Sequence, residues 1–327
     1  MNLTKRQHYV PQCYLKLFSS RYEDKVDYFD KITYKNLSSQ HVKNVAQQRY
    51  YYDFSEEFVK SYNENIENDL NVEEINQQHL EKYFSKLEGG FARALESLTS
   101  KIQAQENLLQ ISSFENIITE EEKKELSFFI ALQSIRTPSY RELLKNFNNI
   151  LEQNYESLFS SEEGKEINDN ELFFYYLNTG ALDRLSTHFL EDFQWSLGII
   201  NHPEQARFKH VRKQFVTDEF LISDNPVINL KHVERRNPLN ISLEFALPLS
   251  PKHIIILRDN NHPEPVDSSV FEINRNQVRI YNEYQYRFSN RFVFHTKSVN
   301  KNKIKNFFSY QSKNLSHNSG SFCVLEF

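Results

Sequence analysis

The stretch HYVPQCYLKLF, residues 8–18, is the most informative part of the chain, because it marks where a helix begins and which side of it is apolar. Pro11 favours the first position of a short helix, where its missing N–H is no loss, and it restricts the preceding residue to extended geometry. The large apolar side chains then fall on one side of that helix: Tyr14, Leu15 and Phe18. We expect His8 to be held just upstream, outside the constraints of the helix.

Composition indicates a globular chain with an aromatic core. Its 327 residues are 39% hydrophobic and include 27 Phe and 18 Tyr beside one Trp and one Met, which is enough for a sizeable interior. Only six glycines are present, and neither a Walker-type nor a dinucleotide-type glycine run occurs. The net charge of −5 predicts no global attraction to nucleic acid, although a local basic patch could still bind it.

Cysteine content and hydropathy point to a cytoplasmic protein. Cys13 and Cys323 lie at opposite ends of the chain, too few for a disulfide framework or a four-ligand zinc site. No apolar run approaches the length of a membrane span, and the N-terminus lacks the apolar region of a signal peptide. The sequence therefore predicts a reducing, cytoplasmic compartment and no membrane partner.

Helical patterns dominate the first half of the chain. Apolar residues recur at helical spacing from Glu74 to about Ile102, and Thr119 with Glu122 has the spacing of a capping box. That second helix is expected to end or bend at Pro138, and helical pattern resumes over 139–158 and 171–195.

Strand-like segments dominate the second half. Short β-like runs occupy 197–200, 213–217, 220–222, 227–230, 241–247 and 254–257, and earlier ones occupy 26–30, 31–34 and 50–54. Separate helical and strand halves favour an α+β fold, with the helices packed on a mostly antiparallel sheet. We predict one domain over 1–327, in which 1–195 is mainly helical with a small β-rich insertion near 26–54, and 196–327 is mainly β with a basic C-terminal region.

Four segments together resemble a known bacterial family. The HYVPQxYLxxF pattern, the Arg136-Thr137-Pro138 helix end, FLISDNPV at 220–227 and LPLSP at 247–251 occur in this order. As a set they resemble the domain-of-unknown-function family 4238 over nearly the whole chain, although Cys13 stands where an aromatic residue is more usual. The resemblance implies a single-domain family without an agreed activity, so it transfers no catalytic residue.

Three carboxylates are candidate metal ligands. Glu81 and Glu88 are seven residues apart, so on a straight helix they point within about 20° of each other. Asp224 follows an apolar strand, where catalytic acids often lie. Such oxygen ligands suit Mg²⁺ or Mn²⁺. The alternatives are a solvated helix edge for the two glutamates and, for Asp224, a turn in which the side chain caps its own backbone.

Three further polar residues are candidate catalytic groups. Gln133 lies at the centre of an apolar helix face, where a buried amide needs partners, and Arg136 follows one turn later. Together they could bind a phosphate or carboxylate, or hydrogen-bond another element. His8 could act as a general base or metal ligand, or could anchor the N-terminus through a main-chain carbonyl. We expect the three side chains to be at least partly buried in one neighbourhood.

The clearest electrostatic feature is the basic region 270–313. It contains nine Lys or Arg residues against two Glu, interleaved with tyrosines and phenylalanines. Such a mixture suits a nucleic-acid strand through phosphate contacts and stacking. The equal alternative is that the aromatic residues belong to the core and that the basic residues balance the acidic segment 53–74, which carries eight carboxylates and one Lys.

Two functional hypotheses follow. In the first, the protein is a metal-dependent hydrolase, a nuclease or phosphodiesterase, in which Glu81, Glu88 and Asp224 hold the ion. His8 would be its acid or base, and Arg136, supported by Gln133, would stabilise phosphate charge. In the second, it is a non-enzymatic module that binds a ligand, nucleic acid or protein. Convergence of the candidate residues in one open cleft favours the enzyme, and dispersal favours the module.

Overall fold

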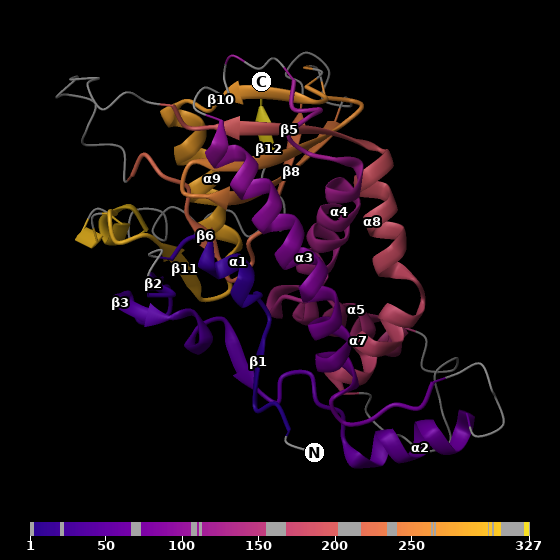
Figure 1. Cartoon of the computed structure of the whole chain (residues 1–327). Helices are drawn as coiled ribbons and strands as arrows, with labels where there is room; N and C mark the ends of the chain where they lie inside the picture. Colours follow the sequence, from indigo (N-terminus) through magenta and orange to yellow (C-terminus); the bar gives the residue numbers. More distant parts are fainter. Residues whose placement is uncertain are drawn as a thin grey trace.

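Helices and a six-stranded sheet form the two main layers of the computed structural model (Figure 1). The structure describes residues 3–19, 23–66, 73–105, 110, 113–154, 168–201, 217–233, 241–262, 264, 266–299, 301–302, 304–308 and 324–326. Nearly half of the described residues are helical and about a quarter are in strands. The predicted α+β class is therefore confirmed.

The N-terminal segment folds as its pattern predicts. Strand β1 (Arg6–His8) pairs antiparallel with β4 (Gln47–Arg49), and α1 (Gln12–Lys16) follows. Pro11 is the residue that precedes α1 and not its first helical residue, and its extended ψ of 142° turns the chain into the helix. The apolar side of this segment is fully buried: Tyr14, Leu15 and Phe18.

Amphipathic helices build the larger part of the core. They are α2 (Glu56–Ile66), α3 (His79–Ala104), α4 (Glu120–Ile135), α5 (Pro138–Asn154), α7 (Asp169–Asn178) and α8 (Ala181–Glu191). Thr119 and Glu122 form the predicted capping box at the start of α4. Figure 1 shows α3, α4 and α8 beside one another next to the sheet.

The predicted helix over 171–195 is two helices and part of a strand. Gly180 separates α7 from α8 in a left-handed conformation, with φ of 72°, which glycine adopts without steric cost. After α8 the chain enters β5 (Phe193–Ile199), so Trp195 lies on a strand. The alternating buried residues of β5 explain the strand better than a helix does: Phe193, Trp195, Leu197 and Ile199 all join the main core.

The large sheet has the strand order β10-β5-β9-β8-β7-β12. Its remaining members are β7 (Ile228–Val233), β8 (Ile241–Ser250), β9 (His253–Asp259), β10 (Ser269–Glu272) and β12 (Val324–Glu326). The four central strands pair antiparallel, and β10 and β12 add parallel edges. Ile255 and Leu257 face the helical core, whereas Ile254 and Ile256 face a second cluster beneath α9 (Arg275–Phe288). Both faces are therefore covered.

A smaller sheet pairs strands from the first part of the chain with strands from its last third. Its order is β3-β2-β11-β6, from β2 (Lys25–Asp30), β3 (Lys35–His41), β6 (Ile222–Ser223) and β11 (Phe292–His295), all antiparallel. The expected strands at 31–34 and 50–54 are turns, and the strands lie beside them at 35–41 and 47–49. A short 3-10 helix, Val42–Asn44, follows β3.

Two predictions remain to be placed. The expected strand at 213–217 lies almost wholly outside the described residues. No helix in the described part of the chain is both long and apolar enough to cross a membrane.

Candidate functional site

The candidate residues His8, Gln133 and Arg136 meet at the N-terminal segment. Gln133 is completely buried in α4, and its Nε2 donates to the main-chain carbonyl of Tyr9 at 2.9 Å. Arg136, only 1% exposed, donates from Nη2 to the carbonyl of His8. The predicted single neighbourhood is therefore confirmed, and both side chains hold the backbone of the segment 8–18.

Arg136 is also the partner of a predicted metal ligand. Its Nη1 and Nη2 donate to Oε1 of Glu88 at 3.1 and 3.0 Å, and its guanidinium lies 5.1 Å from the centre of the Phe84 ring. Burial is the main cause that raises the pKa of Glu81 to about 7, and repulsion from the negative charge of Glu88 adds to it. The two glutamates of α3 thus share one side of the helix, as the sequence predicts, but Glu88 is occupied by an arginine.

The surroundings of His8 favour the neutral form of its imidazole. Burial is the largest cause that lowers the pKa of its imidazole to about 4, and the positive charge of Arg136 lowers it further. Its Nε2 is buried and has no hydrogen-bond partner among the described residues.

The carboxylate of Asp224 binds the backbone of a distant segment. Its Oδ1 accepts from the backbone N–H of Asn290 at 2.8 Å, and its Oδ2 accepts from those of Arg291 and Phe292 at 2.7 and 2.9 Å. Burial raises the pKa of this carboxyl to about 6, although the three N–H groups oppose that shift. The side chain therefore caps backbone, as in the alternative interpretation, but it caps a distant segment and not its own turn.

The three predicted carboxylates are not gathered as ligands of one ion. Within the described ranges, the group of three or more metal-ligand side chains whose ligand atoms all lie within 4.8 Å of one another is His232, Glu244 and His262. Glu81, Glu88 and Asp224 form no such group among the described residues. Arg136 bonds Oε1 of Glu88, and three backbone N–H groups bond the two oxygens of Asp224. The candidate catalytic residues Arg136 and Gln133 are likewise engaged with the main chain.

A cavity of about 660 Å³ lies beside this network. Arg141 connects the two, because its guanidinium lies 4.3 Å from the ring centre of Tyr51 and 5.1 Å from that of Tyr52, the ring that Arg136 also approaches at 5.9 Å. The cavity walls come from β4 and the turn after it, α5 and the start of α7: Gln48, Tyr50, Tyr51, Arg141, Lys145, Asn148, Asn149, Asn168, Asp169, Asn170 and Leu172.

The chemistry of these walls is polar and cationic. Arg141 is 8% exposed and donates from Nη1 to the carbonyl of Tyr51 at 3.1 Å, while its Nε and Nη2 have no acceptor in bonding geometry among the described residues. Lys145 adds a second positive charge at the rim and lies 3.4 Å from Asp169. Tyr50 projects from a turn in which its backbone is left-handed, with φ of 53°, a conformation that costs energy for a bulky side chain.

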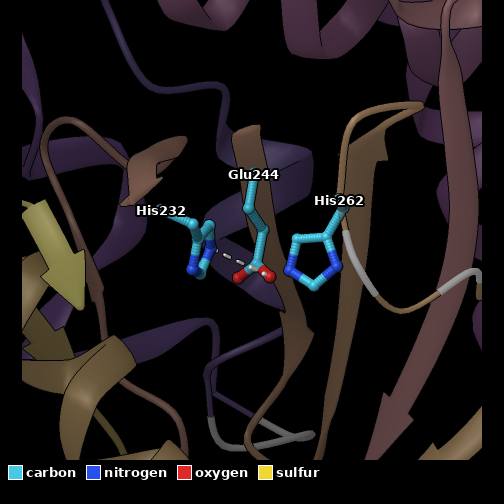
Figure 2. Close-up of side chains that lie close together, drawn as sticks. All are labelled: His232, Glu244 and His262. Carbon is cyan, nitrogen blue, oxygen red and sulfur yellow. Dashed lines mark ion pairs between the residues drawn. The ribbon is translucent and has the colours of Figure 1, made fainter. Parts of the chain in front are cut away.

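A second polar cluster lies within the large sheet, and the sequence analysis missed it. Leu230 pairs with Glu244 and His232 with Ser242 in the β7–β8 register, so His232 and Glu244 project from the same face. His262 follows β9 and reaches the same point. Figure 2 shows the carboxylate of Glu244 between the two imidazole rings.

Glu244 is the centre of this cluster. It is 1% exposed and accepts from Arg258 Nε at 2.8 Å and from the Tyr281 hydroxyl at 2.8 Å, and it lies 3.5 Å from Nε2 of His232. Burial alone would raise the pKa of the Glu244 carboxyl, but these partners lower it to about 2. Burial lowers the pKa of His262, and Arg258 lowers it further.

The available sequence signal for this cluster was a charged residue at an inward position. In ISLEFALPLS, residues 241–250, Glu244 alternates in phase with Ser242 and Ala246, which are buried. Its two histidines are 12 positions before and 18 positions after it, so no compact ligand motif reveals them.

The basic region 270–313 is largely paired within the fold. Arg291 bonds Asp30 at 2.8 Å, Lys301 lies 3.1 Å from Asp27, and Arg275 lies 3.0 Å from Asp218. Several of its aromatic residues are core residues: Tyr281, Tyr284, Tyr286 and Phe294. Among the described residues, the acidic ion-pair partners of this region are Glu23, Asp27, Asp30, Asp218 and Glu283, and none of them lies in the segment 53–74.

Comparison with known proteins gives a family but no activity. A sequence model of the family described as "Protein of unknown function (DUF4238)" matches residues 6–298, so the chain belongs to that family. No curated protein and no solved structure matches the chain.

Proposed function

We propose that this DUF4238 protein is a binding module whose ligand is a small phosphorylated molecule held in the Arg141 cavity. The observation that carries the proposal is a polar cavity whose walls bring together two cations, Arg141 and Lys145, against one carboxylate, Asp169. Guanidinium and ammonium groups form strong charge-assisted hydrogen bonds with phosphate oxygens, so a phosphorylated ligand suits this wall.

The size and lining of the cavity support a ligand of nucleotide size. Its volume of about 660 Å³ lies within the range of small-molecule sites. Arg141 and Lys145 supply two positive charges against one from Asp169, which favours an anion. Tyr50 and the side-chain amides at the rim offer a stacking surface and hydrogen-bond donors and acceptors for a heterocyclic ring.

A hydrolase is less well supported than a binding module. Its metal ligands were to be Glu81, Glu88 and Asp224 with Mg²⁺ or Mn²⁺, and two of these carboxylates have other partners. A nucleic-acid partner for the basic region stays a prediction, since the ion pairs of that region leave fewer cations to contact phosphates.

The experiment is a binding panel on the full-length chain. Adenosine and guanosine mono-, di- and triphosphates, adenosine and inorganic phosphate are titrated by calorimetry. We expect at least one nucleotide to bind in a 1:1 complex and adenosine to bind at least tenfold more weakly, because the phosphate provides the acceptor for the cations.

Two substitutions at the cavity rim test the location. Lys145→Gln removes a rim charge and Asn149→Asp adds a negative one, and each should weaken binding by tenfold or more. Lys60→Gln is the matched control, because Lys60 is also an exposed lysine near a carboxylate, 3.8 Å from Glu64. Equal affinity in all variants, or no binding by any compound, contradicts the proposal.

A further inference from the structure

We propose that His232, Glu244 and His262 bind one divalent transition-metal ion of the zinc type, which would join β7, β8 and the segment after β9. One ligand atom from each residue lies within 4.8 Å of the others, and all three residues are buried. Metal–ligand bonds of about 2.1 Å in tetrahedral geometry place ligand atoms about 3.4 Å apart, so small side-chain adjustments would close the site.

The donor set selects the class of ion. Two imidazole nitrogens and one carboxylate oxygen suit Zn²⁺ and its transition-metal neighbours, whereas Mg²⁺ and Ca²⁺ prefer oxygen ligands alone. Three protein ligands also leave a fourth position for water. The site therefore differs in chemistry from the all-carboxylate set that the sequence suggested.

Neighbouring groups orient two of the three ligands. The Tyr281 hydroxyl donates to Oε1 of Glu244 at 2.8 Å, and such an outer hydrogen bond fixes a ligating carboxylate. Nδ1 of His262 lies 3.3 Å from the main-chain carbonyl of Glu264 and can donate its proton there, which leaves Nε2 without a proton. Since Figure 2 shows the other nitrogen of that ring directed toward Glu244, we assign Nε2 to the ion.

Arg258 limits the affinity of this site. Its Nε donates to Oε2 of Glu244 at 2.8 Å, so its positive charge lies beside the site and repels a second cation. The exposed Glu264, 3.5 Å from Nη1, offsets part of that charge. Arg258→Gln should therefore strengthen zinc binding at least tenfold. This change distinguishes a metal site from an ion-pair network, because a network without a metal gains no zinc affinity when its arginine is removed.

The test uses tag-free, full-length protein treated with a chelator and titrated with Zn²⁺ by calorimetry. We expect one ion per chain and a higher melting temperature with zinc. His262→Ala and Glu244→Gln should each weaken binding at least 100-fold. Co²⁺, measured by its visible absorption, reports the coordination geometry independently of heat.

His188→Ala is the matched control, because His188 is an exposed histidine 2.6 Å from Asp192 and could hold zinc adventitiously. It should bind zinc as the wild type does. The proposal is overturned if folded wild type takes up no zinc, if His262→Ala binds as tightly as wild type, or if Arg258→Gln binds more weakly. None of these residues lines the Arg141 cavity, so the outcome is independent of the binding panel.

Discussion

The guanidinium of Arg136 donates to the main-chain carbonyl of His8, a residue 128 positions earlier in the chain. The same group pairs with Glu88 on α3, so three distant segments share one buried cation. A side chain used in this way stabilises the fold around the motif 8–18. Its Nη1 and Nη2 are engaged by protein acceptors, whereas the sequence suggests a substrate phosphate as their partner.

Replacing Arg136 should be costly. We expect Arg136→Met to lower the free energy of unfolding by about 3 kcal/mol, because it leaves the Glu88 carboxylate and the His8 carbonyl without their donor. Urea unfolding provides the measurement. Arg93→Met, on the exposed surface of α3, is the control and should change stability by no more than about 0.5 kcal/mol. Similar values for the two variants would contradict the role of the buried pair.

Gln133 should contribute to stability through its hydrogen bond to the main-chain carbonyl of Tyr9. We expect Gln133→Met, which preserves much of the volume, to lower the free energy of unfolding by about 1 kcal/mol, since a buried carbonyl loses its donor. Thermal unfolding of this variant can be compared with that of Ser134→Ala, whose hydroxyl bonds only its own helix at Ile130. A more stable Gln133→Met protein would show that the amide is retained for another reason.

Glu81 should make stability depend on pH. Because the folded state raises the pKa of this carboxyl to about 7, it binds the proton more tightly than the unfolded chain does. The stabilisation from this proton is complete below the ordinary carboxyl pKa and is lost as the pH rises through about 7. Glu81→Gln should therefore raise stability at pH 8, by about 1 kcal/mol after solvent screening, and leave it nearly unchanged at pH 4.

Melting temperatures of the Glu81→Gln protein at these two pH values test the prediction. Glu96→Gln, at an exposed position of the same helix, controls for a general effect of removing a negative charge. A Glu81→Gln effect of equal size at both pH values would mean that the carboxyl does not carry the raised pKa.

Asp224 should behave as a backbone cap. We expect Asp224→Asn to lower the free energy of unfolding by about 2 kcal/mol, because an amide NH₂ replaces one acceptor oxygen and faces a buried N–H. Zinc content should stay at the wild-type level. Asp218→Asn, a half-exposed aspartate that pairs with Arg275, is the comparison and should cost less than about 1 kcal/mol. Loss of bound metal in Asp224→Asn alone would restore the ligand hypothesis.

Local patterns in the sequence were sufficient for the helices and most central strands. The capping box at Thr119 and the apolar stripe of α3 depend on neighbours within one or two turns, so spacing reveals them. The edge strand β3 lies a few residues from its expected place because none of its residues is buried and it carries no alternating apolar pattern. Gly180 was the overlooked signal for the break between α7 and α8.

The candidate site was only partly predictable. Gln133 was recognised because an amide on an apolar helix face must be buried, and its partner proved to be the backbone of the opening motif. The cavity beside Arg141 and the cluster around Glu244 could not be read in the same way. Their members come from several elements, and the register that brings them together is set by tertiary packing.

The pairing of β2 with β11 has a consequence for folding during synthesis on the ribosome. Residues 27–30 find their strand partners at 292–295, so the smaller sheet is incomplete until nearly all of the chain has been synthesised. Contacts of such sequence separation form slowly, and until then one edge of β2 remains exposed to other chains. A nascent chain of this protein is thus expected to need protection from association on the ribosome until residues 292–295 have emerged.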